Sequence, residues 1–153
     1  MRSMVLLVCS TGVRQTVRVN GLVGLGAMGF PMAAQIRRKM PASSTFCIYD
    51  IHRPSCENFI SQFSKFGSIV VANSPAEVAE GAQAVVSILP DADIVRQVYL
   101  NTQHGVSAAS TDPNRLLLEC STISPTQARE VAAATKELKA GYYVDCPVSV
   151  SYG

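Results

Sequence analysis

The sequence predicts an α/β protein whose core is a doubly wound, mainly parallel sheet of six strands. Of its 153 residues, 48% are hydrophobic and 16% are charged, so the chain can bury the core of one domain. Short β-rich segments alternate along it with longer segments whose apolar residues recur every three or four positions. Because neighbouring parallel strands are joined by right-handed helical crossovers, helices should cover both faces of the sheet.

The first strand and helix flank a glycine-rich turn. We expect the strand at residues 16–24 (TVRVNGLVG) and the helix at residues 27–40. Pro31 fits only in the first turn of this helix, where its missing N–H costs nothing. Asn20 is an unusual polar residue for a central strand, and it suggests a bulge or an early cap of the strand. The apolar stripe of the helix is predicted to comprise Met28, Met32, Ile36 and Met40.

The next two strands and helices repeat the pattern. A second strand is expected at residues 45–50 and a third at residues 68–72. Between them a helix begins after Pro54 and ends at Gly67, with an apolar face made of Cys56, Phe59, Ile60, Phe63 and Phe66. The segment Ser74-Pro75-Ala76-Glu77 is a capping box with proline at the first helical position, so it predicts the start of a short third helix.

The last part of the chain predicts three more strands, at residues 84–89, 115–120 and 142–146. A fourth helix opens at Pro90-Asp91, with an inner face made of Ile94, Val95 and Val98. Residues 101–114 are polar and predict a surface connection. A second capping box, Ser124-Pro125-Thr126-Gln127, begins the final helix, whose inner face is predicted to contain Ala128, Val131, Ala132, Thr135 and Leu138.

Composition and charge exclude several classes of protein. Thirteen Lys and Arg against eleven Asp and Glu give a formal charge of +2, too small for the basic surface of a nucleic-acid-binding protein. The longest apolar run, residues 4–9, is far shorter than the roughly 18 residues of a membrane span, so no membrane partner is expected. The cysteines are scattered and form no metal-binding spacing, which predicts reduced thiols and no metal site: Cys9, Cys47, Cys56, Cys120 and Cys146.

Residues 1–16 are interpreted as an N-terminal extension in front of the domain. They contain no acidic residue and several Ser and Thr, which is the composition of an organelle transit peptide. A short frayed extension is the alternative. We therefore expect an intracellular protein, mitochondrial if the extension is a transit peptide and cytoplasmic otherwise.

The segment Gly24-Leu25-Gly26-Ala27-Met28-Gly29 follows a predicted strand and opens a predicted helix. In that context GxGxxG predicts a dinucleotide-binding turn of the Rossmann type. The first glycine permits the tight turn, the second lets a pyrophosphate approach the backbone, and the third lets helix and strand pack closely. The helix N-terminus adds free N–H groups and the positive end of a dipole. Glycines that serve only a sharp turn are the alternative.

Asp50 ends the next predicted strand, about twenty residues after the turn. A carboxylate there accepts hydrogen bonds from the adenosine ribose hydroxyls and repels a 2′-phosphate, so NAD is the favoured cofactor. NADP stays possible because Arg53, next to His52, could hold that phosphate. A role for Asp50 in turn formation alone is a further alternative.

Several segments, in order and spacing, resemble the β-hydroxyacid dehydrogenases, which include 3-hydroxyisobutyrate, tartronate-semialdehyde and 6-phosphogluconate dehydrogenases. The resemblance covers residues 17–149 and implies an NAD(P)-binding domain of an oxidoreductase. It is carried by residues 21–33, residues 74–79, Ser87-Ile88-Leu89-Pro90, Glu119-Cys120-Ser121-Thr122-Ile123-Ser124-Pro125 and Asp145-Cys146-Pro147-Val148-Ser149.

The resemblance also implies roles for individual residues. Leu89 and Pro90 would lie along the cofactor, and Ser121 and Thr122 would lie beside the nicotinamide and help to bind a substrate carboxylate. Ordinary strand-to-helix turn chemistry is the alternative for Ser121 and Thr122. The cysteines at positions 120 and 146 replace small residues of the family pattern and are predicted to be small core side chains.

The family reaction moves a hydride between the nicotinamide and a hydroxyl-bearing carbon of a small 3-hydroxy acid, with a lysine as general acid and base. The resemblance implies that this lysine lies after the nucleotide domain, in a Gly-x-x-x-Lys pattern, and that an all-helical second domain follows. Residues 150–153 diverge from the family before the sequence ends, so no catalytic residue is assigned. We expect a truncated product or a fragment that binds a dinucleotide without turnover.

Two other functions stay open from the sequence. One is a non-catalytic dinucleotide-binding or interaction module. The other is a doubly wound domain for a different nucleotide-like ligand, such as a methyl donor.

Overall fold

The computed structural model describes residues 5–10 and 13–148, with side chains described from residue 18 onward. Six parallel strands form its sheet in the order β4-β3-β2-β5-β6-β7. This order, with its reversal between β2 and β5, is that of a dinucleotide-binding Rossmann sheet, and it confirms the predicted fold class. The strands are β2 (Val13–Val23), β3 (Phe46–Tyr49), β4 (Ile69–Val71), β5 (Ala84–Ser87), β6 (Leu116–Glu119) and β7 (Tyr142–Asp145).

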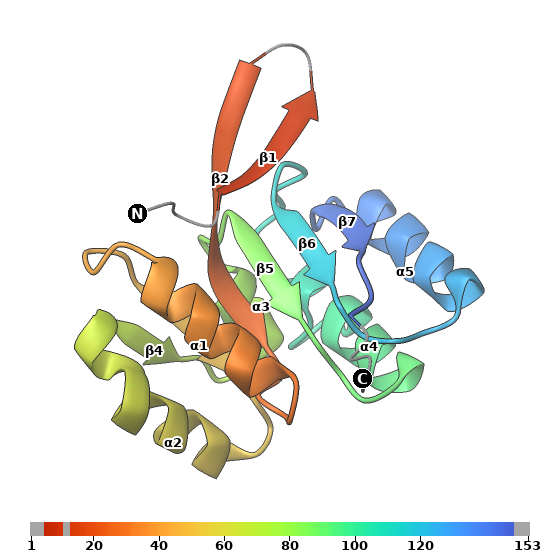
Figure 1. Cartoon of the computed structure of the whole chain (residues 1–153). Coiled ribbons are helices and arrows are strands. Elements are labelled where there is room, and N and C mark those ends of the chain that lie inside the picture. The colour runs from red at the N-terminus through yellow and green to blue at the C-terminus, as the bar shows by residue number, and fades with distance from the viewer. Residues whose placement is uncertain (1–4, 11–12, 149–153) are drawn as a thin grey trace, which may run out of the picture.

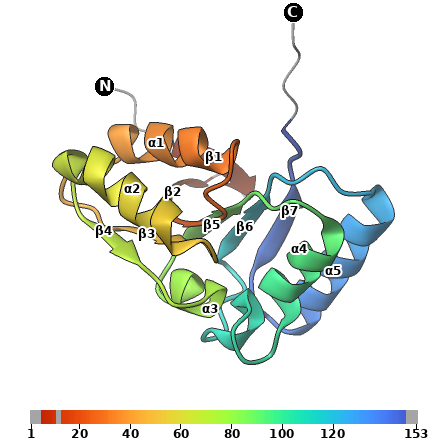
Figure 2. The same ribbon diagram turned by 90° about the horizontal axis from the view of Figure 1, so that it is seen from below.

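Helices cover both faces of the sheet (Figures 1 and 2). On one face α1 (Gly29–Lys39) and α2 (Arg53–Phe63) pack over a core that includes Leu22, Ile48 and Phe59. On the other face lie α3 (Pro75–Ala79), α4 (Ala92–Leu100) and α5 (Pro125–Glu137), over a second core that includes Val85 and Leu117. Two short 3-10 helices, η1 (Ser64–Phe66) and η2 (Val106–Ala108), complete the described elements.

An N-terminal hairpin adds a strand that the sequence pattern did not predict. β1 (Val5–Ser10) pairs antiparallel with the first part of β2, with Val5 opposite Arg18 and Ser10 opposite Val13. The hairpin projects beyond the parallel sheet (Figure 1). β2 therefore begins at Val13 instead of the predicted Thr16, and the expected boundary at residue 16 falls inside a strand.

The expected irregularity at Asn20 is present as a bulge. The pairing of β2 with β5 shifts register between Val19 and Gly21. The Asn20 side-chain Oδ1 accepts a hydrogen bond from the backbone N of Gln83 at 3.0 Å. The amide is therefore satisfied by the backbone that leads into β5, and its partial burial carries no penalty for an unmade bond.

The buried face of α1 differs from the predicted methionine stripe. Its fully buried residues are Gly29, Ala33, Ala34, Ile36 and Arg37, whereas Met28 is 37% exposed and only Ile36 of the predicted stripe is fully buried. The small residues allow the helix to approach the sheet closely, so the buried face of α1 is rotated by part of a turn relative to the predicted methionine stripe. The buried Arg37 guanidinium has no acidic partner in the described part of the chain and donates hydrogen bonds to the backbone carbonyls of Met40, Pro41, Ser44 and Ser68.

Of two further expectations about burial, one held with an exception and one was wrong. Most of the connection 101–114 lies on the surface as predicted, but Gly105 and Val106 are buried, and Val106 in η2 packs in the core against α3 and α4. Leu138 was predicted on the inner face of the last helix, but α5 ends at Glu137 and Leu138 is 43% exposed. Both departures concern residues at the edge of an element, where a local pattern says little about tertiary neighbours.

Residues 149–153 lie outside the described part of the chain, so the predicted divergent tail and Ser149 have no structural description. Among the residues that are described, no helix is both long enough and apolar enough to span a lipid bilayer.

Candidate functional site

A pocket of about 630 Å³ opens at the carboxyl ends of β2, β3 and β5, where the strand order reverses. This volume lies within the range of about 300–1,000 Å³ found for small-molecule sites, and such a switch point is where open α/β sheets bind ligands. Its lining includes most of the cofactor-binding residues predicted from the sequence: Gly24, Gly26, Ala27, Met28, Gly29, Asp50, Leu89 and Pro90.

The three glycines of the turn differ in what surrounds them. Gly24 has a φ of +101°, and a Cβ there would lie 2.2 Å from the carbonyl oxygen of Ile88. A Cβ on Gly29 would lie 1.9 Å from the carbonyl oxygen of Gly24, so this residue permits the close approach of α1 to β2. A Cβ on Gly26 would meet no protein atom within 4 Å. Packing therefore explains two of the glycines, and Gly26 faces open space in the pocket.

The amino end of α1 has backbone donors without partners. Its N-cap, Met28, makes no side-chain hydrogen bond to the helix, and no described residue accepts a hydrogen bond from the N–H groups of Gly26, Ala27 and Met28. Pro31, in the first turn, has no N–H, as predicted. Unpaired N–H groups at a helix N-terminus, together with the helix dipole, form a site for an anionic group such as a phosphate.

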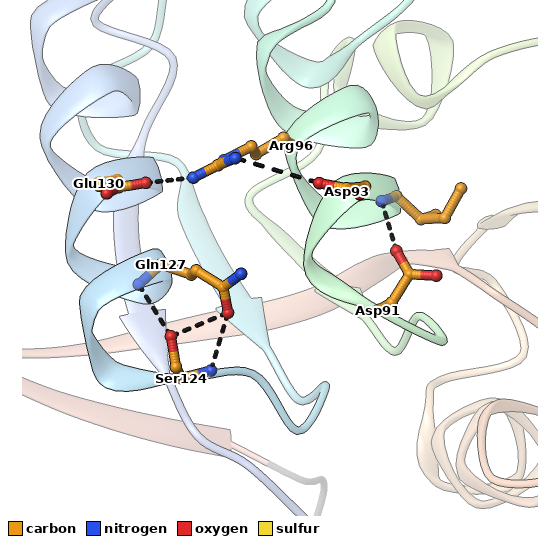
Figure 3. Close-up of polar contacts among 7 residues, drawn as sticks. Asp91, Asp93, Arg96, Ser124, Gln127 and Glu130 are labelled. Atoms are coloured by element: carbon orange, nitrogen blue, oxygen red, sulfur yellow. Dashed lines mark hydrogen bonds and ion pairs between the residues drawn. The ribbon is translucent and has the colours of Figure 1, made fainter.

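The helices on the other face of the sheet have caps of their own (Figure 3). Asp91 accepts a hydrogen bond from the backbone N of Ile94 at the start of α4. Ser124 and Gln127 form the predicted capping box of α5, and an ion pair between Arg96 and Glu130 joins the two helices. α2 also has no side-chain cap, but none of its residues lines the pocket. α1 thus combines an uncapped N-terminus with a position at the pocket.

Asp50 holds the glycine turn against the end of β3. Its Oδ2 accepts a hydrogen bond from the backbone N of Leu25 at 2.6 Å, and its Oδ1 accepts one from the backbone N of His52 at 2.7 Å. The half-buried carboxylate still lines the pocket, and carboxylate oxygens have lone pairs for further donors. Leu25 itself is buried beneath the turn and outside the pocket lining, so its contribution is this N–H.

The side chains of Arg53 and His52, near Asp50, are directed elsewhere. The Arg53 guanidinium donates a 2.6 Å hydrogen bond to the carbonyl of Ala72 and lies over the Tyr49 ring, 5.6 Å from its centroid. The His52 ring nitrogen Nδ1 lies 2.9 Å from the Ser55 hydroxyl, at the start of α2. Both side chains are therefore engaged by protein groups, and neither lines the pocket.

Ser121 and Thr122 lie in the turn after β6, outside the pocket lining. Ser121 is 2% exposed, and its Oγ accepts a hydrogen bond from the backbone N of Leu89 at 2.7 Å. This contact ties the turn after β6 to the turn after β5, which lines the pocket. Thr122 is exposed, and its hydroxyl makes no recorded hydrogen bond to the described protein.

A buried carboxyl supports both turns. Glu119 is fully buried at the end of β6; its Oε1 accepts from the backbone N of Ser121 at 2.7 Å and its Oε2 accepts from the Ser87 Oγ at 2.5 Å. The Tyr99 hydroxyl lies 2.6 Å from the same Ser87 oxygen, and either of these two hydroxyl groups can be the donor. Burial raises the pKa of Glu119, and it raises the pKa of the fully buried Tyr99 well above its usual range.

Sequence reasoning missed the wall of the pocket that faces the glycine turn. That wall comes from α3, α4 and the segment after α4, and includes the polar residues Gln97, Asn101 and His104. The residues that α3 and α4 contribute to this wall follow no known motif, and His104 lies in the connection that was predicted to be a surface loop. It also missed the interaction of Ser87, Tyr99 and Glu119, because the strand pattern gives no sign that a glutamate is fully buried.

Comparisons with known proteins agree with this geometry. The family model for the NAD-binding domain of 6-phosphogluconate dehydrogenase matches residues 20–152. A probable mitochondrial 3-hydroxyisobutyrate dehydrogenase of Dictyostelium discoideum is 35% identical over 144 residues, which are 94% of this chain and 40% of that protein. An NAD-dependent L-serine dehydrogenase of Pseudomonas aeruginosa is 32% identical over 127 residues, 83% of this chain and 39% of that protein.

The solved structures give the same result. The Mycobacterium tuberculosis 3-hydroxyisobutyrate dehydrogenase with L-serine superimposes with a TM-score of 0.67 at 30% identity, and the match covers 84% of this chain and 40% of that one. The chain thus spans about 40% of the length of these relatives. It belongs to the family of the NAD-binding domain of 6-phosphogluconate dehydrogenase, and its relatives include 3-hydroxyisobutyrate dehydrogenases.

Proposed function

We propose that this chain binds NAD in the pocket at the ends of β2, β3 and β5. The pyrophosphate is assigned to the glycine turn and the adenosine ribose to Asp50. The observation that carries the proposal is Gly26: no protein contact requires a glycine there, yet the space next to it is open and the adjacent N–H groups have no protein partner. A phosphate in that space explains both facts.

The preference for NAD over NADP is part of the proposal. A 2′-phosphate on the ribose would approach the Asp50 carboxylate, and the two negative charges repel each other. Arg53, which could neutralise the phosphate, is directed to the carbonyl of Ala72 and to the Tyr49 ring. Binding of NADP would require Arg53 to give up these contacts.

The wider reaction follows from the relatives. We propose that the chain is the nucleotide-binding part of a dehydrogenase that oxidises a small 3-hydroxy acid. When bound, the nicotinamide supplies the acceptor for the hydride. Thr122 is exposed in the turn after β6, which the hydrogen bond between Ser121 and Leu89 holds in place. We assign it to the substrate carboxylate and to the nicotinamide end of the cofactor. Ser121 contributes by holding that turn, because its own hydroxyl is buried.

The 153 residues by themselves are proposed to bind the dinucleotide without turnover. They span about 40% of the relatives' length, and the family resemblance implies that the catalytic lysine lies after the nucleotide-binding domain. Incubation with NAD and a panel of 3-hydroxy acids should therefore produce no NADH above the rate without protein. Steady oxidation of one of those acids would contradict this part of the proposal and leave the binding assignment intact.

Calorimetric titration tests the binding site directly. NAD should bind the parent chain at least tenfold more tightly than NADP. In Asp50→Asn the amide oxygen can still accept from the Leu25 N–H, so the turn is kept while the charge is removed. This variant should bind NADP more tightly than the parent does and narrow the difference between the two cofactors. No heat with either nucleotide at millimolar concentration would refute the proposal.

For the cellular compartment, we propose mitochondria. The acid-poor composition of residues 1–16 supports import, and relatives from Dictyostelium discoideum and mouse are named as mitochondrial. A fluorescent protein fused behind the first sixteen residues should accumulate in mitochondria. Diffuse cytoplasmic fluorescence from that fusion would contradict the assignment.

A further inference from the structure

Two cysteines lie side by side where β6 and β7 end. The pairing of these strands places Glu119 opposite Asp145, so Cys120 and Cys146 occupy the next positions along the two chains. The backbone N of Cys146 donates to the carbonyl of Glu119 at 2.8 Å, and the backbone N of Val148 donates to the carbonyl of Cys120 at 3.2 Å. These hydrogen bonds extend the parallel pairing beyond both strands and hold the two residues in register.

The two sulfur atoms are in contact. The Sγ of Cys120 lies 3.6 Å from the Sγ of Cys146; Cys120 belongs to the core on the side of α1 and α2, and the half-buried Cys146 packs against it. A disulfide has an S–S length of about 2.05 Å, so each sulfur has to move by less than about 1 Å. Neighbouring strands lie about 4.8 Å apart, within the range of roughly 4.4–6.8 Å that joins the Cα atoms of bridged cysteines.

We propose that Cys120 and Cys146 form an oxidisable dithiol site, and that a small disulfide such as oxidised glutathione converts it to an intramolecular disulfide. In the first step the thiolate of one cysteine attacks a sulfur of the small disulfide and releases one glutathione thiolate. In the second step the other cysteine loses its proton, attacks the mixed disulfide and releases the second glutathione. The protein gives up two protons and two electrons, and the small disulfide is reduced to two thiols.

The surroundings decide which cysteine reacts first. Cys146 is half-buried, whereas Cys120 is only 6% exposed, so an external disulfide reaches Cys146 more easily. Burial raises the pKa of Cys146, the hydrogen bond from Cys120 partly opposes this, and the nearby Glu119 and Asp145 add to the rise. Burial raises the pKa of Cys120 further. Cys146 is therefore the attacking residue and Cys120 the resolving one, and the rate should increase with pH.

A disulfide between Cys120 and Cys146 should constrain the turn after β6 and raise the thermal stability of the chain. Cys120 lies between Glu119 and Ser121, whose hydroxyl accepts from the backbone N of Leu89 at the pocket. A covalent link from Cys120 to β7 fixes one end of this turn, and it closes a loop that contains the whole of α5. Constraint of that loop in the unfolded chain should raise the midpoint of thermal unfolding by several degrees, to be reversed by a dithiol reductant.

Mass spectrometry tests the proposal on the folded chain. After incubation with oxidised glutathione at pH 8.5 and alkylation of the remaining thiols, the intact mass should show one internal disulfide, and peptide mapping should join Cys120 to Cys146. Cys120→Ser should accumulate a glutathione adduct at Cys146, because the resolving thiol is missing. Cys146→Ser should form neither the internal disulfide nor the glutathione adduct at a comparable rate. The matched control is Cys56→Ser, which removes a buried cysteine of α2 and should still form the disulfide.

Three results would overturn the proposal. The parent could stop at the mixed disulfide on Cys146, it could stay fully reduced while an exposed model thiol is oxidised, or its disulfide could join other cysteines. Thermal unfolding and circular dichroism of each variant establish that it is folded. The proposal is independent of the dinucleotide site, since the disulfide is measured without any nucleotide.

Discussion

Replacement of Gly26 by alanine should weaken the binding of NAD without destabilising the fold. A Cβ at this position meets no protein atom within 4 Å, and Gly26 is not among the glycines with positive φ. The folded chain can therefore accept the alanine without a clash or backbone strain. Because alanine has fewer unfolded conformations than glycine, the free energy of unfolding should stay unchanged or rise by up to about 1 kcal/mol. For a chain of this size that corresponds to an increase in Tm of up to about 4 °C.

The same methyl group should impair the binding of NAD. It occupies the open space beside the N–H groups of Gly26, Ala27 and Met28, to which the pyrophosphate is assigned. Loss of one hydrogen bond to a charged group costs about 1.5–3 kcal/mol. The Kd for NAD should therefore rise by roughly 10- to 150-fold, since each 1.4 kcal/mol is a factor of ten.

Two other glycines provide the controls. Gly81→Ala places a methyl group in open space outside the pocket, at a φ of +73°, so it should lower stability by about 1 kcal/mol and leave the affinity for NAD unchanged. Gly29→Ala places a Cβ 1.9 Å from the carbonyl oxygen of Gly24 and should destabilise the fold by about 3 kcal/mol or more. Calorimetric titration and thermal unfolding measure both quantities. If Gly26→Ala bound NAD within twofold of the parent, the assignment of the pyrophosphate to this turn would be wrong.

Three further predictions concern stability. Burial raises the pKa of Glu119 in the folded state. At a pH between about 4.3, the usual value of the unfolded chain, and this raised pKa, the folded state holds a proton that the unfolded state releases. The free energy of unfolding should therefore fall as the pH rises through this range. Urea unfolding from about pH 4 to pH 8 should show this fall in the parent and a flatter profile in Glu119→Gln; parallel profiles would contradict it. Arg37→Met should cost about 3 kcal/mol or more in the same assay, because it removes the buried guanidinium that donates to several part-buried carbonyl groups, whereas a cost below 1 kcal/mol would show that water replaces the guanidinium. A double-mutant cycle for the exposed Arg96 and Glu130 pair should give a coupling of only about 0.2–1 kcal/mol that decreases in 1 M salt, and a larger, salt-independent value would be inconsistent with its exposure.

The parts of the site that sequence reasoning found are those with local causes. A strand, a tight glycine turn and a helix follow one another within residues 16–40, so their geometry depends on neighbours in the chain. Asp50 was predicted to lie beside the glycine turn because the parallel sheet brings the carboxyl ends of β2 and β3 together, and the hydrogen bond that its carboxylate accepts from the Leu25 N–H shows that it does. Local order and the rule for parallel sheets were sufficient to predict this placement, but not the hydrogen bond to Leu25 itself.

The far wall of the pocket and the interaction around Glu119 have no local cause. Gln97 and His104 reach the pocket because η2 packs against both α3 and α4 and the backbone N of Ala76 in α3 donates to the carbonyl of His104, and their spacing carries no sign of these contacts. Glu119 is buried because Ser87 and Tyr99, from β5 and α4, satisfy its carboxyl group. A strand that reads LLLE gives no indication of a partner 32 residues away. Such contacts are decided by tertiary packing, which overrides local propensity.

The cap residues themselves carry information about the ligand. α3, α4 and α5 each begin with a serine or aspartate whose side chain accepts from the helix backbone, and all three caps can be read from the sequence. α1 begins after Gly-Ala-Met, which offers no side-chain oxygen, although it is as long as other helices of the fold. Of the two helices without a side-chain cap, α2 contributes no residue to the pocket lining, whereas α1 begins at the pocket. An uncapped helix start at a pocket is expected where function replaces local stability, and a bound pyrophosphate would supply the acceptor that α1 lacks.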